Sequence, residues 1–117
     1  LARRLKTLAQ GEDKPYTAHV AILLRTSEPP LPDLAAVAAG LHMSERTLNR
    51  RLQAEGGSFR NMKSAALAAW GKLYLAHTDQ SVESIAATLG YQDSANFRRA
   101  FRKSEGHSPN AYRQLCE

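Results

Sequence analysis

The chain has 117 residues, a hydrophobic fraction of 43%, one cysteine and a formal net charge of +5. This length suffices for one core, or for two small cores that share a helix, and excludes a further ligand-binding domain among these residues. The composition is globular, with no run of 18 apolar residues, no signal-peptide pattern and no second cysteine for an internal disulfide, so we expect a folded cytoplasmic protein with no membrane partner.

The first residues predict a tail followed by a short helix. Residues 1–15 read as a helix end and a polar stretch, and we expect a linker or the tail of a missing upstream domain. Residues 16–26 place Val20, Leu23 and Leu24 on one side of a helix. Three prolines within residues 28–32 end that helix.

Two helices joined by a turn are expected next. Asp33 can cap a helix that runs to Ala39 and stops at Gly40, because Asp accepts from the free N–H groups of a first turn and glycine closes helices in the left-handed conformation. Ser44 can cap a second helix that reaches Ala54. Gly56 then ends this pair of helices.

Residues 58–78 predict a long spacer helix, because their apolar residues recur at helical spacing. Gly71 inside it costs about 1 kcal/mol relative to alanine. This glycine therefore predicts either a weak point in the helix or close packing against it. Trp70 is expected to be a core aromatic residue.

A second pair of helices and a short final helix complete the chain. Ser81 can cap a helix that leads to a turn at Gly90, and Asp93 can cap a helix that runs to about residue 104. Ser108 followed by Pro109 is a strong start signal for a last helix that ends near residue 115.

Residues 33–57 and 82–106 repeat one pattern. Apolar residues of the first helix and turn recur after 48 positions, and those of the second helix recur after 49: Val37/Ile85, Leu41/Leu89, Met43/Tyr91, Leu48/Phe97 and Leu52/Phe101. The second copy therefore has one extra residue in its turn. We expect a duplicated helix-turn-helix in an all-α chain, with subdomains at 16–57 and 79–117 and a spacer helix at 58–78.

Positive charge concentrates around the second helix of each copy. Residues 44–63 and 93–104 each hold three more basic than acidic residues, whereas the rest of the chain is slightly acidic. This distribution is typical of a surface that binds phosphates. Ordinary solvation of exposed helix faces is the alternative interpretation.

Two stretches resemble the DNA-binding domain of the AraC/XylS family of transcriptional regulators. They are LHMSERTLNRRLQAEGGSF at 41–59 and SIAATLGYQDSANFRRAFRKSEGHSPNAYR at 84–113, and the likeness spans residues 18–115. It is most specific in the second half, where the Ile-Ala, Leu-Gly-Tyr, Phe-x-x-x-Phe, Gly-x-Ser-Pro and Tyr-Arg elements follow the family's order and spacing. The resemblance implies seven helices, with two recognition helices in successive major grooves of one DNA face. Leu67 and Gly71 depart from the family's spacer pattern, which leaves the relative orientation of the recognition helices open.

The first recognition helix turns its two leucines inward and places a polar stripe outward. Arginine can donate two hydrogen bonds to guanine, and asparagine can pair with adenine. By their place in the motif, Arg46, Asn49 and Arg50 match the positions from which family members contact bases. Arg51 leans towards the flank and is expected to touch phosphate.

The second recognition helix offers a chemically poorer set of base contacts. Ser94, Ala95, Arg98 and Arg99 lie outward of its two phenylalanines, and the alanine can contact only a thymine methyl group. We therefore expect the first helix to carry more sequence discrimination and the second more general affinity. The expected DNA-backbone contacts are Ser44, Arg51, Arg102 and Lys103.

The residues give no support for catalysis. His19, His42, His77 and His107 lack metal-ligand spacing, and Cys116 has no second cysteine for a zinc site. The paired glycines after residue 55 end a helix and do not form a phosphate-binding loop. We expect no enzyme, no metal and no cofactor.

Three functions remain open. The leading one is the sequence-specific DNA-binding domain of a bacterial transcriptional regulator, with double-stranded DNA and RNA polymerase as partners. The second is a helical protein-interaction module, and the third is the DNA-targeting part of a DNA-repair protein. The segment before residue 33 indicates a missing N-terminal domain through which any dimerisation would occur, with a short stand-alone regulator as the alternative.

Overall fold

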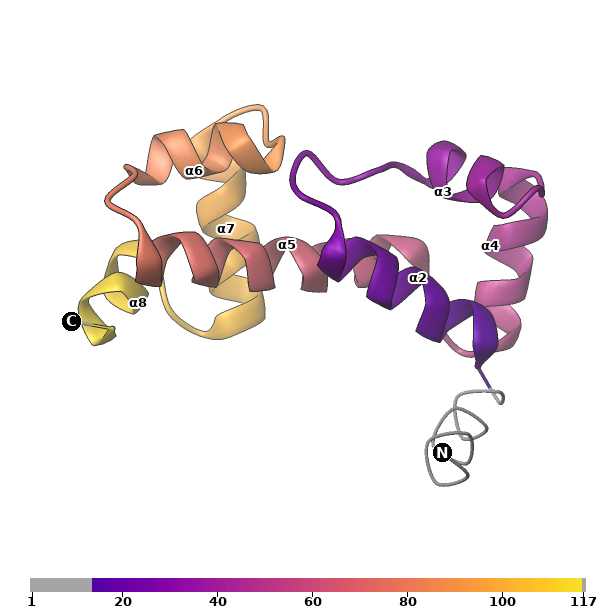
Figure 1. The fold of residues 1–117 in the computed structure, drawn as a ribbon. Helices are drawn as coiled ribbons and strands as arrows, with labels where there is room; N and C mark the ends of the chain where they lie inside the picture. The colour runs from indigo at the N-terminus through magenta and orange to yellow at the C-terminus, as the bar shows by residue number, and fades with distance from the viewer. Residues whose placement is uncertain (1–13, 117) are drawn as a thin grey trace, which may run out of the picture.

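The structure is a computed structural model that describes residues 14–116, so the first 13 residues of the predicted tail at 1–15 lie outside the described residues. Between residues 14 and 116 the chain forms seven α-helices and no strand (Figure 1). The all-α prediction with about seven helices is confirmed. The helices are α2 (Pro15–Thr26), α3 (Leu34–Gly40), α4 (Glu45–Ala54), α5 (Phe59–His77), α6 (Val82–Leu89), α7 (Ser94–Glu105) and α8 (Pro109–Leu115).

Side-chain caps begin six of the seven helices. In each, a Ser or Asp oxygen accepts a hydrogen bond from the backbone N–H three residues later, which satisfies a donor that has no partner inside the helix. The caps of α3 to α8 are Asp33, Ser44, Ser58, Ser81, Asp93 and Ser108. Five of these were predicted, and the cap at Ser58 was not.

The exception is α2, which is capped from a distant part of the chain. Its N-cap residue, Lys14, makes no side-chain capping bond. The Glu55 carboxylate, just after α4, instead accepts from the backbone N–H groups of Tyr16 at 3.2 Å and Thr17 at 2.8 Å. This contact fixes the start of α2 against the end of α4.

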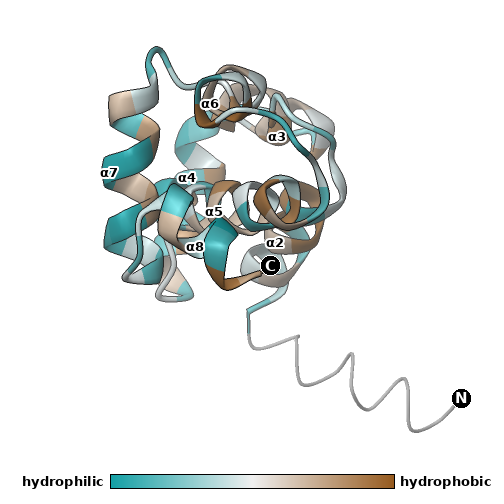
Figure 2. Ribbon diagram, turned by 90° about the vertical axis from the view of Figure 1, so that its left-hand side faces the viewer, coloured by the Kyte–Doolittle hydropathy of each residue, from teal (hydrophilic) through white to brown (hydrophobic). Residues whose placement is uncertain are grey.

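The helix α5 is the axis of the molecule (Figure 1). The pair α3 and α4 lies near the start of α5, α7 crosses its second half at Gly71, and α6 and α8 lie towards its C-terminal end. Figure 2 shows α4 and α7 on the same side of α5, with α2 on the opposite side. The molecule measures 41 × 33 × 22 Å along its principal axes, so α4 and α7 are separated along its long direction.

Two hydrophobic clusters fill the interior. The first joins α2, α3 and α4 to the first half of α5, and its fully buried side chains include Leu24 and Leu48. The second joins the rest of α5 to α6 and α7, and it centres on Phe97 and Phe101. Leu67 and Trp70 are partly buried and pack against both clusters, and of the two Trp70 was predicted to be a core residue. The two helix-turn-helix units therefore share apolar contacts across α5.

The end of α3 differs from the prediction. Gly40 was expected to close this helix, but it is the last helical residue, and the left-handed residue is His42 with φ of 59°. Its counterpart 48 residues later is Gly90, which has φ of 93°. Both turns therefore use a left-handed residue at the same place in the repeat, once as glycine and once as histidine. Histidine is among the residues that adopt this conformation more often than most.

Candidate nucleic-acid interface

The helix α4 exposes the polar residues that the sequence predicted. Leu48 and Leu52 are fully buried against the first cluster. The opposite side of the helix therefore faces outward, with Arg46 and Arg50 exposed and Asn49 half-buried. The Ser44 hydroxyl accepts from the Thr47 N–H at 3.1 Å, so its oxygen already serves as the helix cap.

The helix α7 repeats this arrangement. Phe97 and Phe101 are buried in the second cluster, which turns the charged side of α7 outward. Of the four predicted base contacts on this helix, Ala95 and Arg99 are exposed, and Ser94 and Arg98 are half-buried. The predicted backbone contacts Arg102 and Lys103 are exposed one turn further along.

Arg98 is held in place within the protein. Its Nη2 lies 2.9 Å from Oε2 of Glu83 on α6, and its Nη1 donates to the Ser94 hydroxyl at 3.2 Å. The pKa of the Glu83 carboxyl is lowered, first by a hydrogen bond from its own backbone N–H and then by Arg98. Arg98 was predicted to lie on this face, but its carboxylate partner was not predicted, because the two residues lie 15 positions apart.

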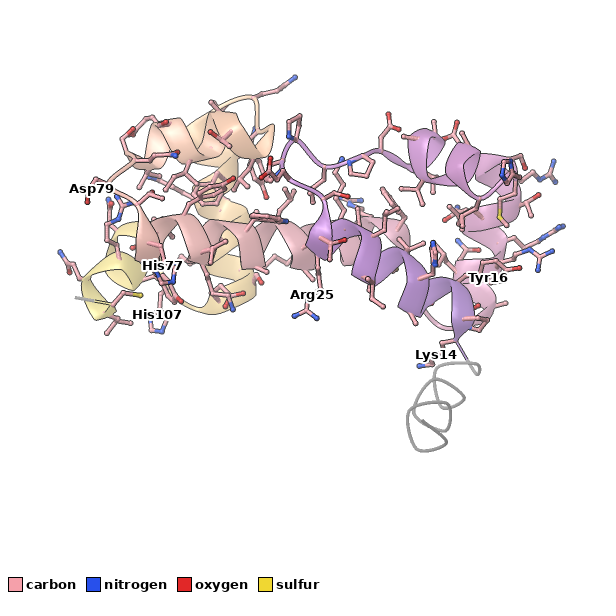
Figure 3. All side chains as sticks on the ribbon, viewed as in Figure 1. Lys14, Tyr16, Arg25, His77, Asp79 and His107 are labelled. Atoms are coloured by element: carbon pink, nitrogen blue, oxygen red, sulfur yellow. The ribbon has the colours of Figure 1, made fainter. Side chains whose placement is uncertain are left out.

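Two other arginines on this side also have partners in the protein. Arg99 donates to the side-chain oxygen of Asn96, one turn earlier on α7. Arg51 donates to the Tyr16 hydroxyl at 3.1 Å, and its guanidinium carbon lies 5.0 Å from the centre of the Tyr16 ring. Figure 3 shows Tyr16 at the start of α2, beside α4. These contacts order the side chains before any ligand is bound.

A groove of about 640 Å³ lies between the first half of α5 and α7. Its rim carries two basic side chains from different helices, Arg60 and Lys103, which are both exposed. Polar groups from Asn61, Ser64 and Ser104 also line it. Lys103 was predicted as a site residue, whereas Arg60 was recognised only as part of a basic stretch.

The described residues contain no cluster suited to a metal ion. His77, Asp79 and His107 lie in one region near the C-terminal end of α5 (Figure 3). However, no group of three or more His, Cys, Asp or Glu side chains between residues 14 and 116 could hold a metal. None of the helices in this part of the chain is long and apolar enough to cross a membrane.

A family profile described as "Helix-turn-helix domain" matches residues 37–115, which include most of the first repeat and all of the second. Among curated proteins, the ornithine utilization regulator of Pseudomonas aeruginosa is 40% identical over 83 residues, which are 71% of this chain and 24% of that protein. The chain thus spans about a quarter of the length of this relative.

Solved structures show the same arrangement of helices. The transcriptional regulator CdpR from Pseudomonas aeruginosa superposes with a TM-score of 0.78 at 35% identity, over 85% of this chain and 31% of that one. The DNA-binding domain of AdpA, a global transcriptional factor solved in complex with a target DNA, gives a TM-score of 0.66 at 26% identity. That match covers 86% of this chain and 88% of the AdpA domain.

Two helix-turn-helix units on one shared helix, with basic residues along both second helices, define a DNA-binding domain of a transcriptional regulator. The chain belongs to the AraC family, in agreement with the resemblance seen in its sequence.

Proposed function

We propose that α4 and α7 bind successive major grooves on one face of double-stranded DNA. Successive major grooves are about 34 Å apart. The 19 residues of α5 span about 29 Å at the rise of an α-helix. The single observation that carries the proposal is that α4 and α7 lie on the same side of this helix and are separated along it, α4 near its start and α7 across its second half at Gly71 (Figures 1 and 2).

The base contacts that we propose are the outward side chains of the two helices: Arg46, Asn49 and Arg50 on α4, and Ser94, Ala95, Arg98 and Arg99 on α7. Exposed arginines on α4 can donate in pairs to guanine, whereas Ala95 can read only a methyl group. We therefore propose that α4 supplies more of the sequence discrimination. Ser44, Arg51, Arg102 and Lys103 are proposed to contact the DNA backbone.

The groove between α5 and α7 adds a site for the DNA backbone. When two helices occupy successive major grooves, the minor groove and its flanking phosphates face the protein between them. The groove offers Arg60 and Lys103 in this central position. We propose that these two cations bind phosphates between the two half-sites, independently of DNA sequence.

The domain is proposed to act within a longer regulator. Residues 16–57 and 79–117 would be the two DNA-binding units and 58–78 their spacer, a division that the two hydrophobic clusters support. By analogy with the longer relatives, an upstream domain would supply dimerisation. We also propose that the regulator contacts RNA polymerase in the bacterial cytoplasm. Its function is proposed to be binding, without catalysis.

Salt dependence of DNA binding tests the proposal. Several phosphate contacts should lower the affinity about a thousandfold between 50 and 200 mM salt. Fluorescence anisotropy of a labelled duplex titrated with the 117-residue chain measures this change. Weak binding with little dependence on salt would contradict it and favour the alternative of a protein-interaction module.

A further inference from the structure

The ion pair between Arg98 and Glu83 divides the arginines of α7 into two kinds. The guanidinium of Arg98 forms an ion pair with the Glu83 carboxylate, with 2.9 Å between Nη2 and Oε2, so the pair has no net charge. Arg99 is hydrogen-bonded to the neutral Asn96. Among residues 14–116, neither Arg99 nor Arg102 forms an ion pair with an acidic side chain. These two arginines therefore keep their full positive charge.

A neutral pair is poorly suited to a phosphate and well suited to a base edge. The carboxylate of Glu83 repels a phosphate oxygen that approaches Arg98, because both are negative. A guanine edge has no net charge and needs only hydrogen-bond donors. The guanidinium has five N–H groups, and the contacts to Glu83 and Ser94 leave donors free for guanine O6 and N7.

The internal repeat supplies an independent comparison. Glu83 corresponds to Ala35 in the first copy, 48 positions earlier, and Arg98 corresponds to Asn49, 49 positions earlier. The first copy thus has the uncharged Asn49 and Ala35 at the two positions where the second copy has the ion-paired Arg98 and Glu83. In both copies the combination at this place of the recognition helix is neutral overall.

We propose that Glu83 is a positioning residue that directs Arg98 to read a guanine and keeps it from binding a phosphate. This inference rests on the proposed function, since it assumes that α7 lies in a major groove. The carboxylate fixes the direction of the guanidinium before DNA binds, which lowers the entropy lost on binding. It also removes one sequence-independent contact from α7.

Glu83→Gln tests this assignment, because it keeps the size of the side chain and removes its charge. Sites are selected from a random DNA pool with the wild-type chain, with Glu83→Gln and with Arg98→Ala. We expect the wild type to enrich a guanine at one position of the α7 half-site. Both variants should lose this preference. Binding of Glu83→Gln to unrelated DNA should also tighten, with a log–log salt slope steeper by about 0.9.

A matched control removes a carboxylate from the other described ion pair. Glu105 lies 3.1 Å from Lys72, and Glu105→Gln should leave the guanine preference unchanged. Thermal unfolding of each variant shows whether the fold is retained. If the wild type enriches a motif that Glu83→Gln enriches equally, with the same salt slope, the inference is wrong and the proposed function stands. If the wild type enriches no motif, both the inference about Glu83 and the proposed function are wrong.

Discussion

Gly71 lies directly against the ring of Phe97, at the point where α5 crosses α7. A Cβ atom on Gly71 would be 3.2 Å from Cε1 of Phe97, which is closer than most Cβ contacts in proteins and would require the ring to shift. The glycine therefore permits close approach of the two helices, and it does not interrupt α5, which is continuous from Phe59 to His77. Of the two possibilities that the sequence left open for this residue, close packing is the one observed.

The first prediction concerns this contact. Gly71→Ala should gain about 1 kcal/mol in helix propensity. Because Phe97 is buried and cannot move freely, overpacking should cost about 1 to 3 kcal/mol, so we expect a net loss of stability. Urea unfolding measures the difference. In a Phe97→Leu background the same substitution should cost less unfolding free energy. A Gly71→Ala single variant that is more stable than the wild type would contradict the account.

The left-handed turn before α7 gives a second prediction. Gly90 has φ of 93°, and a Cβ there would meet nothing within 4 Å. Gly90→Ala should therefore destabilise the domain through backbone strain alone, by about 1 kcal/mol. Gly40→Ala is the control, because Gly40 is helical and a Cβ there would also meet nothing within 4 Å. Alanine at this position should therefore stabilise the domain. Equal effects at both glycines in denaturant unfolding would be inconsistent with this explanation.

The third prediction is a dependence of stability on pH. Burial alone would raise the pKa of Glu55, but hydrogen bonds from Thr17 and Tyr16 outweigh it and hold this pKa below its usual value of 4.5. The Glu55 carboxyl therefore binds a proton less readily in the folded state than in the unfolded state. The cap contributes its full stability above pH 4.5, and this contribution is lost as the pH falls through the lowered pKa. Glu55→Gln should cost about 1 kcal/mol near pH 7.

This difference between the wild type and Glu55→Gln should shrink when unfolding is measured at pH 3. Glu28, exposed in the loop after α2, provides the control, because Glu28→Gln removes a carboxylate that caps no helix. A constant difference between wild type and Glu55→Gln from pH 7 to pH 3 would show that the charge of Glu55 is not what stabilises α2.

The sequence predicted the elements of this domain better than the contacts between them. Caps and apolar spacing are local, which is why the starts of α4 and α7 were correct. The partner of Arg98 lies on another helix and the cap of α2 comes from Glu55, 38 residues beyond Thr17. Periodicity carries no information on such pairs. The end of α3 was wrong because a left-handed histidine replaces the glycine that usually marks this turn.

The fourth prediction separates base contacts from phosphate contacts. Arg50→Ala should weaken binding to the preferred site by about 1 to 3 kcal/mol and relax its specificity. Arg60→Ala, in the groove, should weaken binding to all duplexes alike and reduce the salt slope by about 1. Arg25→Ala is the control of equal charge, because α2 lies on the side of α5 away from α4 and α7 (Figures 2 and 3). Competition binding with specific and unrelated duplexes distinguishes the two patterns; identical losses for Arg50→Ala and Arg60→Ala would refute the assignment.

Selection of binding sites from a random DNA pool with the 117-residue chain tests the central claim most directly. Because the outward residues of α4 and α7 differ, one copy of the domain should enrich an asymmetric site. Its two sequence blocks should be centred about 10 base pairs apart, the spacing of successive major grooves. Enrichment of a single short block, or of no motif, would contradict the account that both helices read DNA together.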